Sequence, residues 1–216
     1  MRIVIRSLLA STIISVALIG SAAGATPEAE QKFRQVCATC HGPQGEGKRE
    51  LKTPSIASLP AWYVQTQLEK FQKSIRGTAA DDVSGQQMHA IAATLTPRMT
   101  EAIAGLVSKL PRNPTRNTLK GDLTEGEFIF RDVCMQCHRY NATGELVFKS
   151  PPLIGLQDWY IERQLRKFRD GNRGADKRDI KGAKMHLMVN DLSDADLRGV
   201  ASYISVLAAK QAKPAK

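Results

Sequence analysis

The chain has 216 residues, of which 42% are hydrophobic and 24% are charged, a composition that is ordinary for a globular protein and excludes a disordered or fibrous one. Its formal net charge is +10, from 31 Lys and Arg against 21 Asp and Glu, which favours an anionic partner. Aromatic residues make up only 6% of the chain, so we expect something other than side chains to fill part of its interior.

The first 25 residues have the three-part layout of a secretory signal peptide. Arg2 and Arg6 supply a positive start, residues 8–20 are apolar, and Ala-Gly-Ala at positions 23–25 forms an A-x-A cleavage site. The apolar stretch is shorter than the ~20 residues of a spanning helix, and an uncleaved N-terminal anchor is the alternative. We predict cleavage and export to the periplasm, which makes the charge 29 − 21 = +8 and excludes nucleic acid as the partner.

The remaining chain contains two copies of one unit, offset by 97 residues. Sliding the sequence on itself by this offset aligns many residues without a gap, among them, in the first copy, Phe33, Pro54, Trp62, Tyr63, Gln67, Phe71, Arg76, Gly77, Met88 and His89. Two copies indicate two domains rather than a solenoid, which needs three or more repeats. The domains are predicted at residues 26–110 and 124–209, with an extended linker at 111–123 and a basic tail at 210–216.

Each copy is expected to be helical, which predicts an all-α fold. In the first copy, helices should begin at Thr26-Pro27, near Trp62 and at Thr96-Pro97. In the second copy, they should begin at a capping box that starts at Thr124, at the plausible N-cap Asp158, and at Ser193. No stretch alternates in the way that a strand would.

All four cysteines lie in two C-x-x-C-H motifs, Cys37-Ala-Thr-Cys40-His41 and Cys134-Met-Gln-Cys137-His138. Two thiols with this spacing can form thioethers with the two vinyl groups of one haem, and the next residue, His, can bind its iron. The motifs therefore predict two covalently attached haem c groups.

Three other interpretations of the cysteines are weaker. An oxidising compartment favours disulfides, but the placement of all four cysteines in two regular motifs argues against them. Zinc needs four ligands where one motif offers three. A thioredoxin-like redox pair needs a βαβ context, which neither copy has.

The sixth ligand of each iron has several candidates, which are Met88, His89 and Met99 in the first copy and Met185, His186 and Met188 in the second. The repeat pairs Met88 with Met185, whereas Met99 and Met188 have no methionine at the matching position. Met88 and Met185 also stand in glycine-preceded segments, which we expect to be loops. His89 and His186 are in register too, so spacing leaves bis-His ligation open.

These motifs resemble the diheme cytochrome c4 family, in which a class I cytochrome c fold is duplicated in one chain. The resemblance covers nearly all of residues 26–209. It implies that Met88 and Met185 are the distal ligands, and that the carbonyl groups of Pro54 and Pro151 accept a hydrogen bond from the proximal histidines.

Two departures between the copies are small. Arg139 follows His138 where the first copy has Gly42, and Ser58 stands where the second copy has Gly155. Neither position is a predicted ligand.

The resemblance implies an electron carrier and not an enzyme. It would move single electrons from a quinol-oxidising complex or a dehydrogenase to a terminal oxidase or reductase. A diheme peroxidase would need an open iron site, against which the matched methionines argue. A dedicated cytochrome subunit of a dehydrogenase complex remains open.

The charge distribution suggests the kind of partner. Residues 163–184 carry nine Lys and Arg against three Asp and flank Met185, so we expect redox partners with acidic docking surfaces. Peripheral association with a membrane remains open. Arg76 and Arg173 are expected either to pair with haem propionates or to be solvated.

Overall fold

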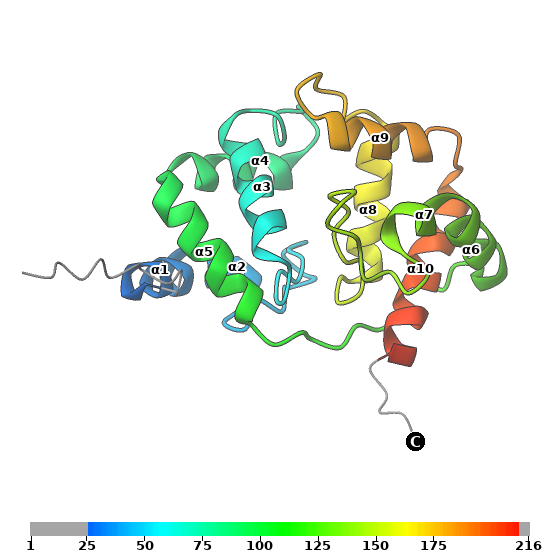
Figure 1. Cartoon of the computed structure of the whole chain (residues 1–216), viewed down its shortest axis with the longest axis horizontal. Coiled ribbons are helices and arrows are strands. Elements are labelled where there is room, and N and C mark those ends of the chain that lie inside the picture. The colour runs from blue at the N-terminus through cyan, green and yellow to red at the C-terminus, as the bar shows by residue number, and fades with distance from the viewer. Residues whose placement is uncertain (1–25, 212–216) are drawn as a thin grey trace, which may run out of the picture.

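Residues 26–211 are described by a computed structural model, which folds into two helical halves lying side by side (Figure 1). The first half contains α1 (Pro27–Lys32), η1 (Phe33–Cys37), α2 (Ala38–His41), α3 (Ala61–Gln72), α4 (Val83–Ala93) and α5 (Pro97–Lys109). The second contains α6 (Leu123–Ile129), η2 (Phe130–Cys134), α7 (Met135–His138), α8 (Asp158–Arg169), α9 (Ile180–Val189) and α10 (Asp194–Gln211). The predicted signal peptide at residues 1–25 lies outside the described residues, as do residues 212–216 of the predicted tail.

The all-α prediction is confirmed. The β-type pairs within residues 26–211 are two isolated bridges, Lys48 with Thr53 and Glu145 with Ser150. In the same range, no helix combines the length and the apolar character that crossing a bilayer requires.

Two helices of the first half, α1 and α5, begin where the sequence predicts. Thr26 accepts a hydrogen bond from the Ala29 amide, and Thr96 accepts one from the Met99 amide, each with a proline at the first helical position. These helix starts can be predicted from local sequence, because an N-cap oxygen accepts a hydrogen bond from an amide that the first turn leaves unpaired.

Two predicted caps in the second half are wrong. The N-cap of α6 is Asp122, which accepts from the amides of Thr124 and Glu125, so the helix begins ahead of the predicted capping box. Asp158 is the first residue of α8 and not its cap. Its buried carboxylate accepts instead from the backbone amides of Thr118 and Leu119, and thereby fastens the linker to α8.

The segments that carry Met88 and Met185 are helices and not the predicted loops. Each has an aspartate N-cap: Asp82 accepts from the Gly85 amide at 2.7 Å, and the matching aspartate of α9 accepts from the Gly182 amide at 2.7 Å. An aspartate three positions before a glycine thus starts a helix here, because the amide without a Cβ can approach the carboxylate closely.

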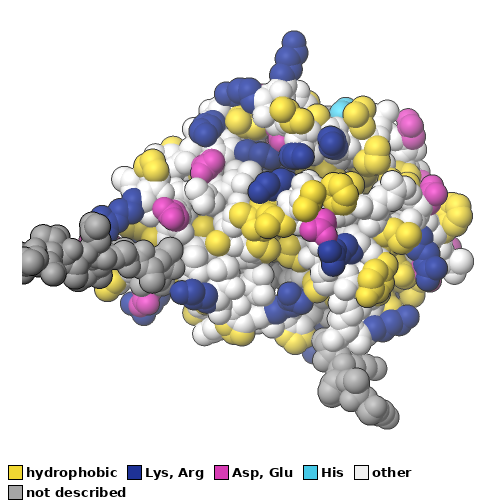
Figure 2. Space-filling model, in the orientation of Figure 1, with side chains coloured by type: hydrophobic (Ala, Val, Ile, Leu, Met, Phe, Trp, Pro, Cys, Tyr) yellow, Lys and Arg dark blue, Asp and Glu magenta, His cyan; other side chains and the backbone are white. Residues whose placement is uncertain are grey.

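The core of each half is built on its middle helix. In the first half α3 packs on α4 and α5, and in the second α8 packs on α9 and α10. The contact of α6 with α10 is close, because a Cβ on Gly126 would lie 2.1 Å from the carbonyl oxygen of Gly199. On the face shown in Figure 2, Lys and Arg side chains gather along the upper edge of the molecule, where the segment leading into α9 lies.

Candidate functional site

The two C-x-x-C-H segments have the same backbone. In each, a π-helical turn (η1 or η2) ends at the first cysteine and a four-residue helix (α2 or α7) ends at the histidine. Turns of this rare kind are concentrated at functional sites. All four cysteines lie within the described part of the chain, and there none of them forms a disulfide. Burial raises the pKa of Cys37 to about 11 and that of Cys134 to about 12.

The two motif histidines are buried and held alike. His41 Nδ1 lies 2.9 Å from the carbonyl oxygen of Pro54, and His138 Nδ1 lies 3.0 Å from that of Pro151. Burial keeps the pKa of both imidazoles below its ordinary value, although the carbonyl contact opposes this shift. A neutral ring that donates from Nδ1 has a lone pair on Nε2, the form in which histidine binds metals.

A tight loop brings each proline back to its histidine. The amide of Gly47 donates to the carbonyl of His41, and a Cβ on Gly47 would lie 2.5 Å from the carbonyl carbon of Pro54. Gly144 repeats both relations in the second half. Glycine is therefore required at this point of each copy for the chain to pass so close to the proline.

The candidates for the sixth ligand face different surroundings. Met88 and Met185 pack against the hydrophobic core. The Nδ1 atoms of His89 and His186 instead contact the carbonyl oxygens at the ends of α3 and α8. Neighbouring residues on a helix point about 100° apart. One residue of each Met-His pair can therefore face a haem, and the Nδ1 contact, which His41 and His138 also make, does not by itself decide which one does.

The other two methionines are placed differently from each other. Met99 lies in α5 and packs against the core, whereas Met188 is half exposed at the end of α9. They do not occupy matching positions in the two halves.

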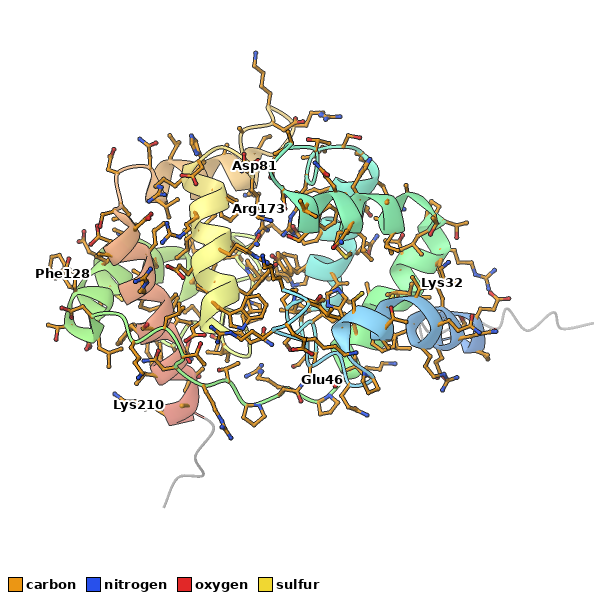
Figure 3. The ribbon with its side chains drawn as sticks, turned by 180° about the vertical axis from the view of Figure 1, so that it is seen from behind. Lys32, Glu46, Asp81, Phe128, Arg173 and Lys210 are labelled. Carbon is orange, nitrogen blue, oxygen red and sulfur yellow. The ribbon has the colours of Figure 1, made fainter. Side chains whose placement is uncertain are left out.

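The two halves meet in a network of matched residues. Arg76 donates to Gln67 of its own half at 2.7 Å and to Gln164 of the other half at 2.9 Å. Arg173 mirrors this, donating to Gln164 at 2.9 Å and to Gln67 at 3.0 Å. Figure 3 shows Arg173 at the junction of the halves. Each guanidinium also lies over a phenylalanine ring of its own half and within 3.5 Å of a tyrosine hydroxyl of the other half.

The expectation that Arg76 and Arg173 are solvated is wrong, because they are 9% and 8% exposed. Their hydrogen-bond partners within residues 26–211 are amide and phenol oxygens, all of them neutral groups. Buried cations are normally paired with an anion. Neither guanidinium therefore has a carboxylate as a hydrogen-bond partner within these residues.

Two lysine–aspartate pairs lie beside this network. Lys70 of α3 donates to Asp179 at 2.7 Å, and Lys167 of α8 donates to Asp82. Both pairs cross from one half to the other, and both aspartates are the N-caps described above.

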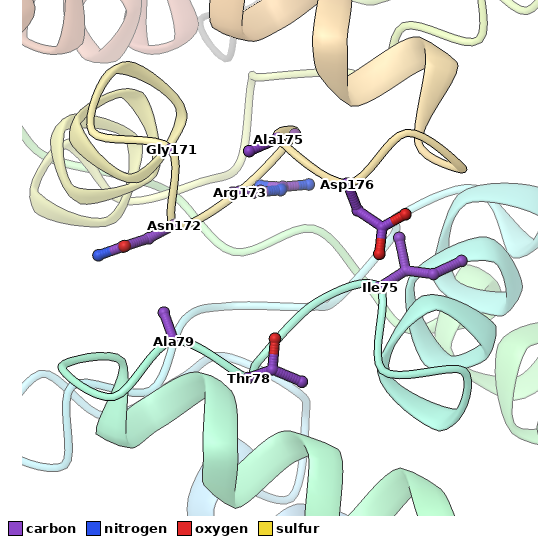
Figure 4. Close-up of a pocket in the computed structure, with 9 residues that line it drawn as sticks. Ile75, Thr78, Ala79, Gly171, Asn172, Arg173, Ala175 and Asp176 are labelled. Atoms are coloured by element: carbon purple, nitrogen blue, oxygen red, sulfur yellow. The ribbon is translucent and has the colours of Figure 1, made fainter.

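A pocket of about 330 Å³ opens between the two halves, lined by Ile75, Thr78 and Ala79 of the first half and by residues 171–176 of the second (Figure 4). None of the predicted iron ligands or cysteines lines this pocket, although Arg173 does. Within residues 26–211, no three His, Cys, Asp or Glu side chains gather in the way that a metal site would require.

Two helical units, each with a C-x-x-C-H segment and a buried histidine tied to a proline carbonyl, define a c-type cytochrome. The Cytochrome c family matches residues 28–108 and 123–208. The chain is 30% identical over 208 residues to a thiosulfate dehydrogenase electron acceptor of Thiomonas intermedia, covering 90% of this chain and 85% of that protein.

Two further relatives are cytochromes c4. The protein of Azotobacter vinelandii is 26% identical over 182 residues, covering 80% of this chain and 84% of the relative. The crystal structure of reduced cytochrome c4 from Pseudomonas stutzeri superposes with a TM-score of 0.67 at 26% identity, covering 84% of this chain and 98% of that one. The chain belongs to the cytochrome c family and, within it, to the diheme cytochrome c4 family.

Membership determines the cofactor and the general role. Two C-x-x-C-H motifs in two cytochrome c domains imply two covalently attached haem c groups. The protein is an electron carrier with redox partner proteins, and these parts of the sequence-based prediction are confirmed.

Proposed function

We propose that the chain is a periplasmic shuttle that takes single electrons from a quinol-oxidising complex or a dehydrogenase and passes them to a terminal oxidase or reductase. The observation that carries the proposal is the repeated contact of a buried histidine with a proline carbonyl directly after each C-x-x-C segment. Such a contact orients the ring and increases its donor strength toward a metal. Each haem, when bound, supplies an iron that cycles between Fe(III) and Fe(II).

The residues divide the work in the same way in both halves. We assign haem 1 to residues 26–110, with thioethers from Cys37 and Cys40 and with His41 and Met88 as iron ligands. Haem 2 belongs to residues 124–209, where the corresponding residues are Cys134, Cys137, His138 and Met185. Methionine is favoured over His89 and His186 because Met88 and Met185 are matched across the repeat and pack against the hydrophobic core, and because the resemblance to diheme cytochromes c4 implies methionine ligands.

The domain interface also fits a haem, since it holds two buried guanidiniums, Arg76 and Arg173, with neutral partners. Haem carries two propionates, and carboxylates are the anions that arginine binds most strongly. We assign Arg76 and Arg173 to the propionates, which would neutralise the interface and join the two haem environments.

In the basic segment at residues 163–184, fewer cations are available to bind an acidic partner than the composition suggests. Several of its cations are used internally, among them Arg166, Lys167, Arg169 and Arg178, which pair with acids of this chain. The exposed cations without an ion pair are Lys177, Lys181 and Lys184. We propose that these lysines provide the electrostatic attraction for an acidic partner near α9.

A second candidate function is that of a dedicated electron acceptor for one dehydrogenase. The name of the relative from Thiomonas intermedia, thiosulfate dehydrogenase electron acceptor, suggests it. Both candidates require the same haem sites. They differ in the donor.

The ligand assignment is tested by optical redox titration of the purified holoprotein. Two components with positive potentials, and a weak far-red sulfur-to-iron band from each oxidised haem, are expected. Met88→Ala and Met185→Ala should each remove one band and lower one potential, because a thioether ligand favours Fe(II). Absence of the band from the unsubstituted protein would rule out methionine ligation.

The donor is tested by stopped-flow reduction. Purified quinol-oxidising complex with quinol, and thiosulfate dehydrogenase with thiosulfate, are each mixed with the oxidised holoprotein. Rapid reduction by the first supports the general shuttle, and rapid reduction by the second alone supports the dedicated acceptor. A triple variant of Lys177, Lys181 and Lys184 to Gln should lower the rate of reduction by whichever donor is effective, and should make that rate less dependent on salt concentration.

A further inference from the structure

The two lysine–aspartate pairs connect each half to the methionine helix of the other half. Asp82 caps α4, which carries Met88, yet its ion-pair partner is Lys167 of the second half. Asp179 caps α9, which carries Met185, yet its partner is Lys70 of the first half. The arrangement is therefore crossed.

Burial makes these contacts stronger than ordinary surface ion pairs. The aspartate side chains are 3% exposed, and those of Lys70 and Lys167 are 17% and 13% exposed. An exposed pair of this kind contributes little, whereas one shielded from water is costly to break, because the remaining charge is left buried without a partner.

Each aspartate is held from two directions at once. Oδ1 of Asp82 accepts from the Gly85 amide in the first turn of α4 and from the ammonium group of Lys167. A Cβ on Gly85 would lie 2.2 Å from Oδ2 of this aspartate, so the carboxylate is packed tightly against the first turn of α4. The start of α4 therefore cannot shift without breaking its cap or losing the lysine of the other half. The same relations hold for Asp179, Gly182 and Lys70.

We propose that Lys70 and Lys167 are positioning residues, each of which holds the helix that presents the methionine ligand of the other domain's haem. The proposal rests on the assignment of Met88 and Met185 as ligands. Lys70 thus acts on haem 2, although it lies on the central helix of the haem 1 domain. Lys167 acts on haem 1, and more strongly, because it also donates to Ser84 Oγ at 3.3 Å and Lys70 has no second contact of this kind.

The crossed effect distinguishes positioning from general stability. Lys70→Leu and Lys167→Leu are each made in the holoprotein on two backgrounds, Met88→Ala, which leaves the far-red band of haem 2, and Met185→Ala, which leaves that of haem 1. Oxidised protein is titrated with imidazole, which competes with methionine for the iron. The concentration that abolishes the band measures how firmly the methionine is held.

Lys70→Leu should make haem 2 bind imidazole roughly tenfold more tightly, the scale of one hydrogen bond to a charged group, and should change haem 1 less than twofold. Lys167→Leu should do the reverse, with the larger change. Lys70→Arg and Lys167→Arg should restore most of the original resistance. Lys73→Leu, an exposed lysine at the end of α3, should change neither haem.

Asp179→Asn and Asp82→Asn cover the case in which the leucine variants fail to fold. Asparagine keeps the N-cap but weakens the ion pair, so the same crossed pattern is expected at a smaller size. An equal change at both haems, a change confined to the haem of the lysine's own half, or no change would overturn the positioning role. Failure of the Met→Ala backgrounds to remove one band each would instead contradict the ligand assignment.

Discussion

The two halves build the same backbone from different residues. After the motif histidine, both chains turn with a positive φ, which Gly42 adopts at +81° and Arg139 at +65°. After the proline, glycine stands in the second half instead: Gly155 has φ +89°, and Ser58 of the first half has φ +63°. Each half thus uses glycine at one strained position and a bulkier residue at the other. The loop that returns the proline to the histidine imposes the conformation, and the sequence at these two points adapts to it.

The strain is greater at Arg139 than the sequence alone suggested. Its ψ of 159° places it in a region that is almost restricted to glycine. Its side chain compensates in part by pairing with Glu145 across the loop. The comparison indicates that the haem-binding loops keep their backbone geometry even where a residue other than glycine must adopt a strained conformation.

The largest expected effect tests whether the halves bind haem independently. Cys37→Ala with Cys40→Ala should remove the covalent haem from the first half alone, and Cys134→Ala with Cys137→Ala should do the same in the second. Each thioether pair belongs to one macrocycle. Mass spectrometry of protein matured in a competent host should therefore find one haem per chain in both double variants. Loss of both haems from either variant would contradict independent loading.

The next effect tests the symmetry of the interface. Arg76→Leu and Arg173→Leu each leave two glutamine oxygens without one donor, so each should lower the free energy of unfolding by about 2–4 kcal/mol. Because their contacts mirror one another, the two losses should be similar. Chemical denaturation of the holoprotein measures them. The exposed residue Arg178, changed to Leu, serves as the control and should shift stability only slightly.

A smaller effect tests the exchanged glycines. Arg139→Gly should raise the free energy of unfolding by about 1 kcal/mol, because it relieves the backbone strain. Gly42→Arg should lower it by a similar amount, since Gly42 has φ 81° and ψ 156°, in the same region that is almost restricted to glycine. Thermal unfolding of the two variants provides the measurement. A stability loss in Arg139→Gly would mean that the contact with Glu145 outweighs the strain.

The smallest effect concerns pH. Burial opposes ionisation of Asp82, but the hydrogen bond and charge of Lys167 outweigh it, so the pKa of Asp82 lies below its ordinary value. The ionised aspartate therefore stabilises the fold above the ordinary carboxyl pKa of about 4, and this contribution is lost as the pH falls through the lowered pKa. The stability gap between the natural protein and Asp82→Asn should narrow below pH ~4. A gap that is constant with pH would show that the charge is irrelevant.

Much of the site could be predicted from the sequence because its signals are local or repeated. The two C-x-x-C-H motifs and the offset of 97 residues give the cofactor, the domain count and the pairing of Met88 with Met185. The helical setting of these methionines was missed, because a short segment that follows a glycine has the composition of a loop. Asp82 and Asp179, as N-caps, were the available signal.

The domain interface could not be predicted in the same way. Arg76 meets Gln164 across 88 positions, and Lys70 meets Asp179 across 109. No periodicity within either copy brings these residues together. Their match across the repeat, with Gln67 and Gln164 also in register, is consistent with an approximately two-fold interface but does not reveal which residues touch.

The mirrored interface has a consequence for the direction of electron flow. Matched arginines and lysines present the same charges to both haem environments, so the junction itself gives neither iron the higher affinity for an electron. A driving force between them must come from places where the halves differ, such as the charged turn at residues 48–52 and its largely apolar counterpart at 145–149. The junction itself then favours neither direction, and the features that differ between the halves, together with the redox partners, determine the direction of electron transfer.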